Sequence, residues 1–283
     1  MKICRTKADV RETVREWKRD DAHVGVVTTM GYLHEGHLGL VRLAREKADR
    51  VVATIFVNPT QFGPGEDLDT YPRDEEHDLE LLEAEGVDAL FLPSVEEMYG
   101  AAGDTHVEVP GLSGVLQGAL RPGHFRGVST VVTKLFHIVT PDFAVFGEKD
   151  YQQLTLIRQM VRDLDMPLEI IGHPTVREAD GLAMSSRNVR LTAEHRQEAV
   201  ALSRSLARAE ELARSSPQIA DLEVAVRAEL ASAPSSEIKS ADIRDAETLE
   251  ELSGTLDRPA VILLAVLFGD VLLIDQRVVA PAS

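Results

Sequence analysis

The sequence has a single cysteine, Cys4, few aromatic residues and fewer basic than acidic side chains. One cysteine cannot form a disulfide within the chain, which fits a reducing compartment. The 30 lysines and arginines against 47 aspartates and glutamates give a net charge of -17, and sequence-independent nucleic-acid binding needs a basic surface instead. No apolar run approaches membrane-spanning length, and the first residues lack an apolar signal core. These absences predict a soluble, cytoplasmic protein with no nucleic-acid or membrane partner.

The remaining composition is globular, with 283 residues that are 44% hydrophobic and 27% charged. Strand-like apolar runs occupy residues 23–29, 50–57, 87–92, 142–146 and 167–176. Helical patterns lie between them at 38–48, 74–85, 128–139 and 151–164. This alternation predicts an α/β fold with a Rossmann-like, doubly wound parallel sheet. Residues 94–127 are glycine-rich and fit no single element.

The pattern changes after residue 176. Amphipathic helices are predicted at about 193–214 and 218–232, and two apolar strands flank the hairpin signal Gly269–Asp270. We therefore expect a Rossmann-like catalytic domain over 1–176 and a second, smaller α+β lid domain over 177–283.

The stretch Met30–His37 lies where the first of these strands passes into a helix. Exposed amides at a helix start and the helix dipole favour phosphate, and Gly31 and Gly36 would let a nucleotide approach the backbone closely. His34 and His37 would place two imidazoles at the same helix start. An isolated H-x-G-H is equally compatible with ordinary turn and cap residues.

Four segments, 30–37, 57–62, 147–153 and 176–187, follow predicted strands and should share the carboxyl edge of the sheet, where open α/β folds bind ligands. Lysine, arginine and helix-start amides suit a polyphosphate, and neutral amides suit a hydroxylated substrate. The polar residues concerned are His34, His37, Asn58, Gln61, Lys149, Asp150, Gln153, Ser185, Ser186 and Arg187. The set indicates nucleotidyl transfer, although lysine and arginine are often only surface charges.

Two neighbouring stretches have simpler interpretations. The turn-rich loop 63–73 has the length of a lid, and little apolar content would hold it in place. The acidic run 74–78 is expected to be a solvated helix start, where carboxylates suit the dipole.

Five segments, in order, resemble the motifs of pantothenate synthetases (pantoate–β-alanine ligases), a family of the H-x-G-H nucleotidyltransferase superfamily. They are residues 29–37, 56–62, 121–128, 146–153 and 177–188, and residues 243–249 and 273–275 resemble the family's smaller domain. Two positions depart from the family pattern, because Tyr32 stands where alanine is more usual and Thr28 where proline is common. We expect the Tyr32 ring to point away from the phosphates.

The resemblance implies an ATP-dependent ligase that condenses pantoate with β-alanine through an enzyme-bound pantoyl adenylate, releasing pyrophosphate and AMP. It also implies Mg²⁺ on the ATP phosphates, without a dedicated protein metal site, and a homodimer. Two alternatives are another H-x-G-H nucleotidyltransferase that releases a nucleotide conjugate, and a catalytically inert nucleotide-binding protein. A tRNA-charging enzyme is disfavoured by the acidic composition.

The resemblance also assigns roles to residues of this chain. The catalytic residues it implies are His34, His37, Lys149 and Arg187. ATP would contact Met30, Gly31, Tyr32, Leu33, His34, Glu35, Gly36, His37, Gly147, Glu148, Lys149, Asp150, Val176, Met184, Ser185, Ser186 and Arg187. Pantoate would be held by Asn58, Gln61 and Gln153, and β-alanine would approach Gln61.

Overall fold

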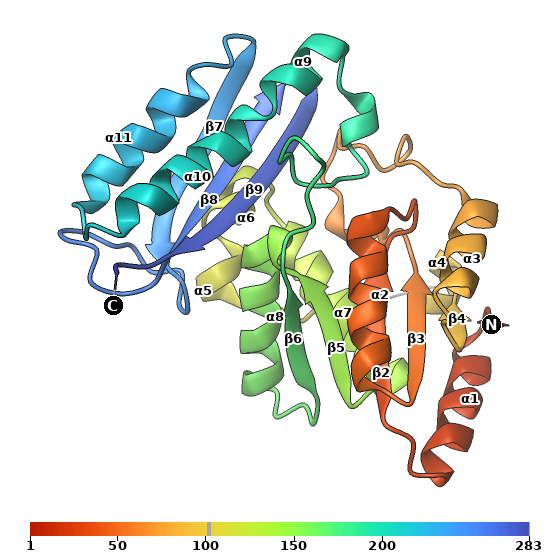
Figure 1. Ribbon diagram of the computed structural model, residues 1–283. Coiled ribbons are helices and arrows are strands. Elements are labelled where there is room, and N and C mark those ends of the chain that lie inside the picture. The colour runs from red at the N-terminus through yellow and green to blue at the C-terminus, as the bar shows by residue number, and fades with distance from the viewer. Residues whose placement is uncertain (101–102, 283) are drawn as a thin grey trace. The chain divides into compact units, whose positions relative to one another are not determined.

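The computed structural model describes residues 1–100 and 103–282, and the chain forms two compact units (Figure 1). Unit 1 contains Met1–Gly147 and Leu156–Pro174, and unit 2 contains Glu148–Thr155 and Thr175–Ser283. The short segment 148–155 therefore groups with the C-terminal part of the chain. Residue 283, the last of the expected 177–283 domain, lies outside the described residues.

Unit 1 is built on a six-stranded parallel sheet with the order β1-β4-β3-β2-β5-β6. Its strands are β1 (Lys2–Cys4), β2 (Val24–Thr29), β3 (Arg50–Ile55), β4 (Ala89–Phe91), β5 (Phe143–Gly147) and β6 (Glu169–His173). The chain moves outward from β2 through β3 to β4, and then in the opposite direction from β5 to β6. The expected doubly wound sheet is confirmed, and its switch point lies between β2 and β5.

Helices cover both faces of this sheet (Figure 1). The helices in this part of the chain are α1 (Lys7–Arg19), α2 (Glu35–Lys47), α3 (Glu75–Ala84), α4 (Val95–Tyr99), α5 (Pro110–Ser113), α6 (Gln117–Leu120), α7 (His124–Val139) and α8 (Tyr151–Asp163). Side chains of α2 and α3 share one buried cluster with Val145 of β5. The next residue along β5, Phe146, contacts Phe136 of α7 edge-on, with ring centroids 6.3 Å apart. Because neighbouring strand residues point to opposite faces, α7 covers the other side.

Unit 2 has a three-stranded antiparallel sheet of β7 (Ser236–Asp245), β8 (Ala260–Phe268) and β9 (Val271–Val279). The predicted hairpin is confirmed, and Gly269 has the positive φ of 62° that its tight turn needs. Strand β7 was not predicted. Its buried positions alternate only over its second half, so its apolar pattern is weak.

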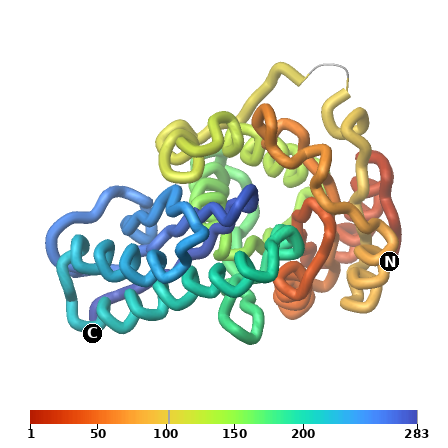
Figure 2. Tube along the Cα trace, turned by 90° about the horizontal axis from the view of Figure 1, so that it is seen from above, coloured from red at the N-terminus to blue at the C-terminus, as the bar shows by residue number. Residues whose placement is uncertain are grey.

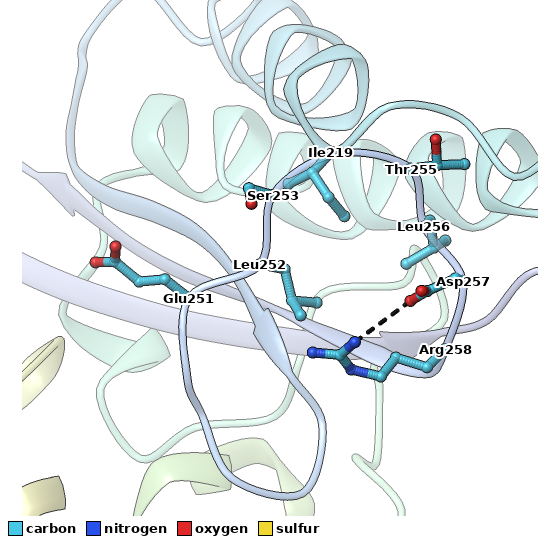
Figure 3. A pocket seen from close by; sticks show the side chains of 8 residues that line it. All are labelled: Ile219, Glu251, Leu252, Ser253, Thr255, Leu256, Asp257 and Arg258. Carbon is cyan, nitrogen blue, oxygen red and sulfur yellow. Dashed lines mark hydrogen bonds and ion pairs between the residues drawn. The ribbon is translucent and has the colours of Figure 1, made fainter.

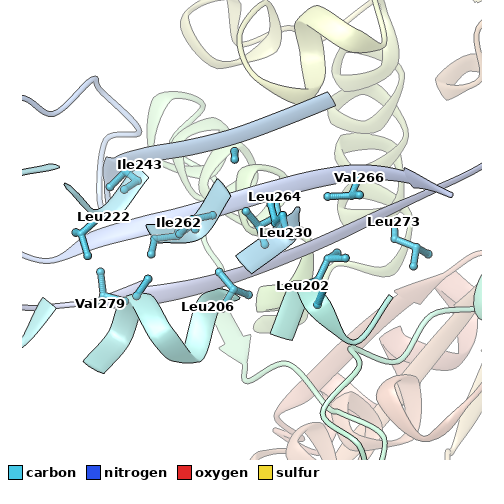
Figure 4. Close-up of a cluster of buried hydrophobic side chains, with 14 of the residues drawn as sticks. Leu202, Leu206, Leu222, Leu230, Ile243, Ile262, Leu264, Val266, Leu273 and Val279 are labelled. Carbon is cyan, nitrogen blue, oxygen red and sulfur yellow. The ribbon is translucent and has the colours of Figure 1, made fainter. Parts of the chain in front are cut away.

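Helices α10 (Ala201–Ala213) and α11 (Ile219–Leu230) lie side by side in unit 2 (Figures 1 and 2). Their apolar side chains, including Leu206 and Leu222, pack against β8 and β9 in one buried cluster (Figure 4). The single helix predicted at 193–214 is wrong in one respect, because α9 (Ala193–Glu198) ends before α10 begins. No proline or glycine marks that break, so the sequence carries no signal for it.

Candidate functional site

The strand, glycine turn and helix predicted around Met30–His37 are confirmed. Strand β2 ends at Thr29, and α2 begins at Glu35 with His34 as its N-cap. Between them the backbone is left-handed at two successive residues, Gly31 (φ 81°) and Tyr32 (φ 52°). Glycine adopts this conformation readily, whereas tyrosine does so at a cost. The turn lies at the carboxyl edge of the sheet, beside the switch point.

The amides of this turn are already bound to side chains. The Gly31 N–H donates to Thr29 Oγ1 at 3.1 Å. The N–H groups of Tyr32 and Leu33 donate to the two carboxylate oxygens of Asp78, at 2.8 and 2.6 Å. These three residues precede the first turn of α2, so the expectation that amides at the helix start bind phosphate stays a prediction.

His34 and His37 form a capping box at the start of α2. The Gly36 N–H donates to His34 Nδ1 at 3.1 Å, and the His34 N–H donates to His37 Nδ1 at 3.3 Å. The two rings lie close, with centroids 4.1 Å apart. Because each Nδ1 accepts a hydrogen bond, the proton of each neutral ring is assigned to Nε2. Both histidines are thus cap residues whose Nε2–H groups are the donors of the pair.

Asp78 differs from the expected solvated helix start. Asp78 is only 2% exposed, whereas Glu75 and Glu76 of the same helix turn are exposed. Burial raises the pKa of the Asp78 carboxyl, against the opposing effect of the two N–H donors from the Leu33 and Tyr32 backbone. The sequence pattern gave no reason to separate this aspartate from its charged neighbours.

Asn58 and Gln61 follow β3, in and beside the 3-10 helix η1 (Pro59–Gln61). Asn58 is 1% exposed, and its Oδ1 accepts from Tyr99 Oη at 2.7 Å and from Thr60 Oγ1 at 2.9 Å. Its Nδ2 donates to Gln61 Oε1 at 3.1 Å and to the Gly127 carbonyl at 3.2 Å. Asn58 therefore fixes the orientation of the Gln61 amide, leaving its Nε2 as the donor end.

Gln61 connects the two predicted segments of unit 1. Its Nε2 donates to Met30 Sδ at 3.3 Å, which brings the 57–62 segment against the turn between β2 and α2. The backbone carbonyl of Gln61 accepts from His124 Nδ1 at 2.8 Å, and Arg121 donates to His124 Nε2 at 3.2 Å. Arg121 and His124 were recognised within the 121–128 segment, but no role was predicted for them.

The loop 63–73 has two anchors. Glu66 forms an ion pair with Arg121 at 2.5 Å, and that guanidinium lowers the pKa of the Glu66 carboxyl. Tyr71 is 5% exposed and contacts Phe62 edge-on, with ring centroids 6.0 Å apart. The expectation that little apolar content holds this loop overlooked the tyrosine ring.

Gly147 ends β5, and the remaining members of the 147–153 segment belong to unit 2. Glu148, Lys149 and Asp150 form the 3-10 helix η2, which contacts β9, and Gln153 lies in the first turn of α8. The adjacent Tyr151 is buried and donates its hydroxyl to the Ala246 carbonyl at 2.9 Å. This bond attaches the segment to the turn after β7.

Val176 and Met184–Arg187 also lie in unit 2. The Met184 N–H donates to the Val176 carbonyl at 2.9 Å, which closes a loop between them. Arg177 anchors the loop to β9 through paired bonds to the buried Asp275, at 2.7 and 2.9 Å. Ser185, Ser186 and Arg187 are half-buried at the end of this loop, and the Arg187 N–H donates to Ser185 Oγ at 3.3 Å.

Most of the predicted site residues are half-buried, with Gly31, Leu33 and Asn58 buried. Glu35 is exposed, and its carboxylate forms an ion pair with Arg42. Arg42 also pairs with Glu85.

A separate cavity of about 240 Å³ lies in unit 2, formed by Ile219 and the loop 251–258 (Figure 3). Arg258 at its wall pairs with Asp257 at 3.4 Å and with Asp245 at 2.8 Å. None of the predicted site residues lines this cavity. In the part of the chain that the structure describes, no group of three or more His, Cys, Asp or Glu side chains is placed to hold a metal ion, and no helix is long and apolar enough to span a membrane.

Comparison with known proteins gives one consistent result. The model of the pantoate-beta-alanine ligase family matches residues 2–278. The pantothenate synthetase of Sinorhizobium medicae is 52% identical over 100% of this chain and 98% of its own. That of Bartonella bacilliformis is 52% identical over 98% of this chain and 99% of its own.

Solved structures agree with this result. The pantothenate synthetase of Thermus thermophilus has a TM-score of 0.94 at 48% identity, covering 99% of this chain and 100% of its own. The pantoate-beta-alanine ligase of Francisella tularensis, solved with beta-gamma ATP and beta-alanine, has a TM-score of 0.80 at 32% identity, covering 98% and 97%. The likeness in sequence and structure spans both units, and the chain belongs to the pantoate–beta-alanine ligase family.

Proposed function

We propose that this protein joins pantoate to β-alanine at the expense of ATP, which is cleaved to AMP and pyrophosphate. Membership of the family over residues 2–278 supports the reaction, and the Francisella ligase was solved with an ATP species and β-alanine. Mg²⁺ would enter with the ATP phosphates as part of the substrate. The protein would act in the cytoplasm as a homodimer.

The chemistry divides into two displacements. A pantoate carboxylate oxygen attacks the α-phosphorus of ATP, and the bond to the β-phosphate breaks to release pyrophosphate. The amine of β-alanine then attacks the acyl carbon of the mixed anhydride, AMP leaves, and the amine loses a proton. A carboxylate alone is a poor acylating agent, so the adenylate supplies the leaving group. Since water would hydrolyse it, the site has to exclude water while it exists.

The observation that carries this proposal is the arrangement of His34 and His37 at the start of α2. Their Nδ1 atoms accept backbone hydrogen bonds, at 3.1 and 3.3 Å, which supports Nε2–H as the group offered to ATP phosphate. We therefore propose that both Nε2–H groups donate to the phosphates and stabilise the charge that develops on the departing pyrophosphate.

Gln61 and Gln153 are proposed to hold pantoate, with Gln61 also approaching β-alanine. The contacts of Asn58 support an indirect role for it, because both ends of its buried amide bind protein atoms and one of them is Gln61 Oε1. We infer that Asn58 orients Gln61, whose Nε2–H then faces the substrate.

Residues of unit 2 complete the proposed set. Lys149 would neutralise phosphate charge, assisted by Ser185, Ser186 and Arg187. The other residues proposed to contact ATP are Met30, Gly31, Tyr32, Leu33, Glu35, Gly36, Gly147, Glu148, Asp150, Val176 and Met184. We retain 177–283 as the proposed lid domain.

The test is a product assay with MgATP, pantoate and β-alanine, omitting each in turn. AMP should form only when all three are present. A transferase that releases a nucleotide conjugate would instead form its product without β-alanine. His37→Ala and Lys149→Ala should each lower turnover by at least about 100-fold, the scale of losing one charge-stabilising group. His137→Ala, at an exposed histidine of α7, is the matched control and should leave turnover unchanged. Near-normal turnover in a folded His37→Ala variant would contradict the assigned role.

A further inference from the structure

The carboxylate of Asp78 is placed unlike any other in the first turns of α3. Asp74 caps the helix, with the His77 N–H donating to its Oδ1 at 3.2 Å, and Glu75 and Glu76 are exposed. Asp78 instead is 2% exposed and faces the turn that follows β2. A buried carboxylate is costly unless hydrogen bonds compensate it, so its position needs an explanation.

The Asp78 carboxylate accepts two hydrogen bonds from the turn between β2 and α2. Its Oδ2 accepts the Tyr32 N–H at 2.8 Å, and its Oδ1 accepts the Leu33 N–H at 2.6 Å. The backbone of Tyr32 is left-handed, a conformation that is unfavourable for residues other than glycine and needs support from its surroundings. Two charge-assisted hydrogen bonds on successive amides provide that support.

Asp78 also packs closely against Gly31. A Cβ at Gly31 would lie 2.9 Å from Asp78 Oδ2 and 3.0 Å from Ile55 Cγ2, so a side chain at residue 31 would displace one of these groups. Immediately after Leu33 the chain reaches His34, the N-cap of α2. A shift of the Tyr32–Leu33 backbone would therefore move the histidine pair.

We propose that Asp78 is a positioning residue for nucleotide binding: it holds Tyr32 and Leu33 in the one turn conformation that presents His34 and His37 to the ATP phosphates. This inference rests on the proposed function in that the turn has to bind ATP. It assigns no contact between Asp78 and substrate. The carboxylate is buried because it has to reach the N–H groups of Tyr32 and Leu33.

The experiment compares Asp78→Asn with Asp74→Ala. The asparagine keeps the size of Asp78 but can accept only one of the two N–H groups, and its own NH₂ opposes the other. Asp74→Ala removes the N-cap of the same helix without touching the turn, and so controls for weakening of α3. The melting temperature and the Kd of MgATP by titration calorimetry are measured for each, well below the melting temperature.

Asp78→Asn should weaken MgATP binding at least about tenfold, because small displacements of binding groups are costly. Asp74→Ala should lower the melting temperature while changing the Kd by less than about twofold. Asp78→Ser, which is shorter and can still accept one N–H, serves in the same comparison if the asparagine variant does not fold. A Kd that is unchanged in the Asp78 variants, or an affinity that falls in step with stability at both positions, would overturn the inference. A wild-type protein that binds MgATP but forms no AMP would instead overturn the proposed ligation.

Discussion

Replacing Gly127 by alanine tests how tightly α7 holds the Gln61 segment. Gly127 lies inside α7, and its carbonyl accepts a hydrogen bond from Asn58. A Cβ at this position would lie 2.4 Å from the Thr60 carbonyl oxygen, 2.6 Å from the Thr60 carbonyl carbon and 2.7 Å from Gln61 Cα. All three are backbone atoms, so no side-chain rotation can relieve the overlap.

Two opposing effects decide whether Gly127→Ala raises or lowers the stability of the protein. Alanine is favoured over glycine in a helix interior by about 1 kcal/mol. Carbon atoms pack at about 3.5–4.0 Å, so the backbone of η1 has to move by about 1 Å, and such overpacking costs about 1–3 kcal/mol. Because backbone lies on both sides of the contact, we expect an overpacking cost near the upper end of that range, which leaves a net loss of stability of about 2 kcal/mol. A displacement of Gln61 by about 1 Å should also lower kcat/KM for pantoate by about 100-fold.

Urea unfolding and steady-state kinetics measure the two effects. Gly111→Ala is the matched control, because it lies in the short helix α5 with no atom within 4 Å of the added Cβ. It should be as stable as the wild type or slightly more so, with unchanged kinetics. A Gly127→Ala variant that behaves like this control would refute the tight packing of α7 on η1 and the role given to Gln61.

Substitutions at Tyr32, Glu66 and Asp245 each have an expected effect. Tyr32→Ala should lower stability by only about 1 kcal/mol because the ring is half-buried, and the Kd of MgATP should change less than about threefold; a larger loss of affinity at an unchanged melting temperature would place the ring in the site. Glu66→Gln removes the ion pair with Arg121, so amide hydrogen exchange in the loop that carries it should accelerate while global stability falls by less than about 1 kcal/mol; unchanged exchange would show that the pair does not anchor the loop. The pKa of Asp245 is lowered from 3.8 to about 2, mainly by the Thr248 N–H, so its stabilising contribution is complete above the unfolded pKa and is lost as the pH falls through about 2. Urea midpoints measured from about pH 5 to about pH 2 should therefore fall more steeply for the wild type than for Asp245→Asn, and parallel curves would contradict the assignment.

The sequence was most informative where local pattern and tertiary role agree. The apolar run before Met30 and the helical pattern after it predicted β2, the turn and α2, because the parallel strand is buried and α2 packs one face on it. The Gly269–Asp270 hairpin was also predicted correctly, because its tight turn requires a positive φ and glycine at that position signals it.

The failures occurred where long-range contacts decide the outcome. Asp78 looks like its exposed acidic neighbours in sequence, and only a turn 45 residues away makes it a buried acceptor. Tyr71 was overlooked in the same way, because its partner Phe62 lies at the other end of the loop. The side chains of Thr29 and Asp78 bind the amides of Gly31, Tyr32 and Leu33 in the turn before α2, and the sequence carries no signal for these contacts.

The central claim is that pantoate is activated by ATP before β-alanine reacts. Its most direct test is the exchange of labelled pyrophosphate into ATP, measured with MgATP and pantoate but without β-alanine. Exchange should appear and should depend on pantoate, because an enzyme-bound pantoyl adenylate can return to ATP when pyrophosphate attacks it. Exchange that requires β-alanine, or that proceeds without pantoate, would contradict the adenylate mechanism.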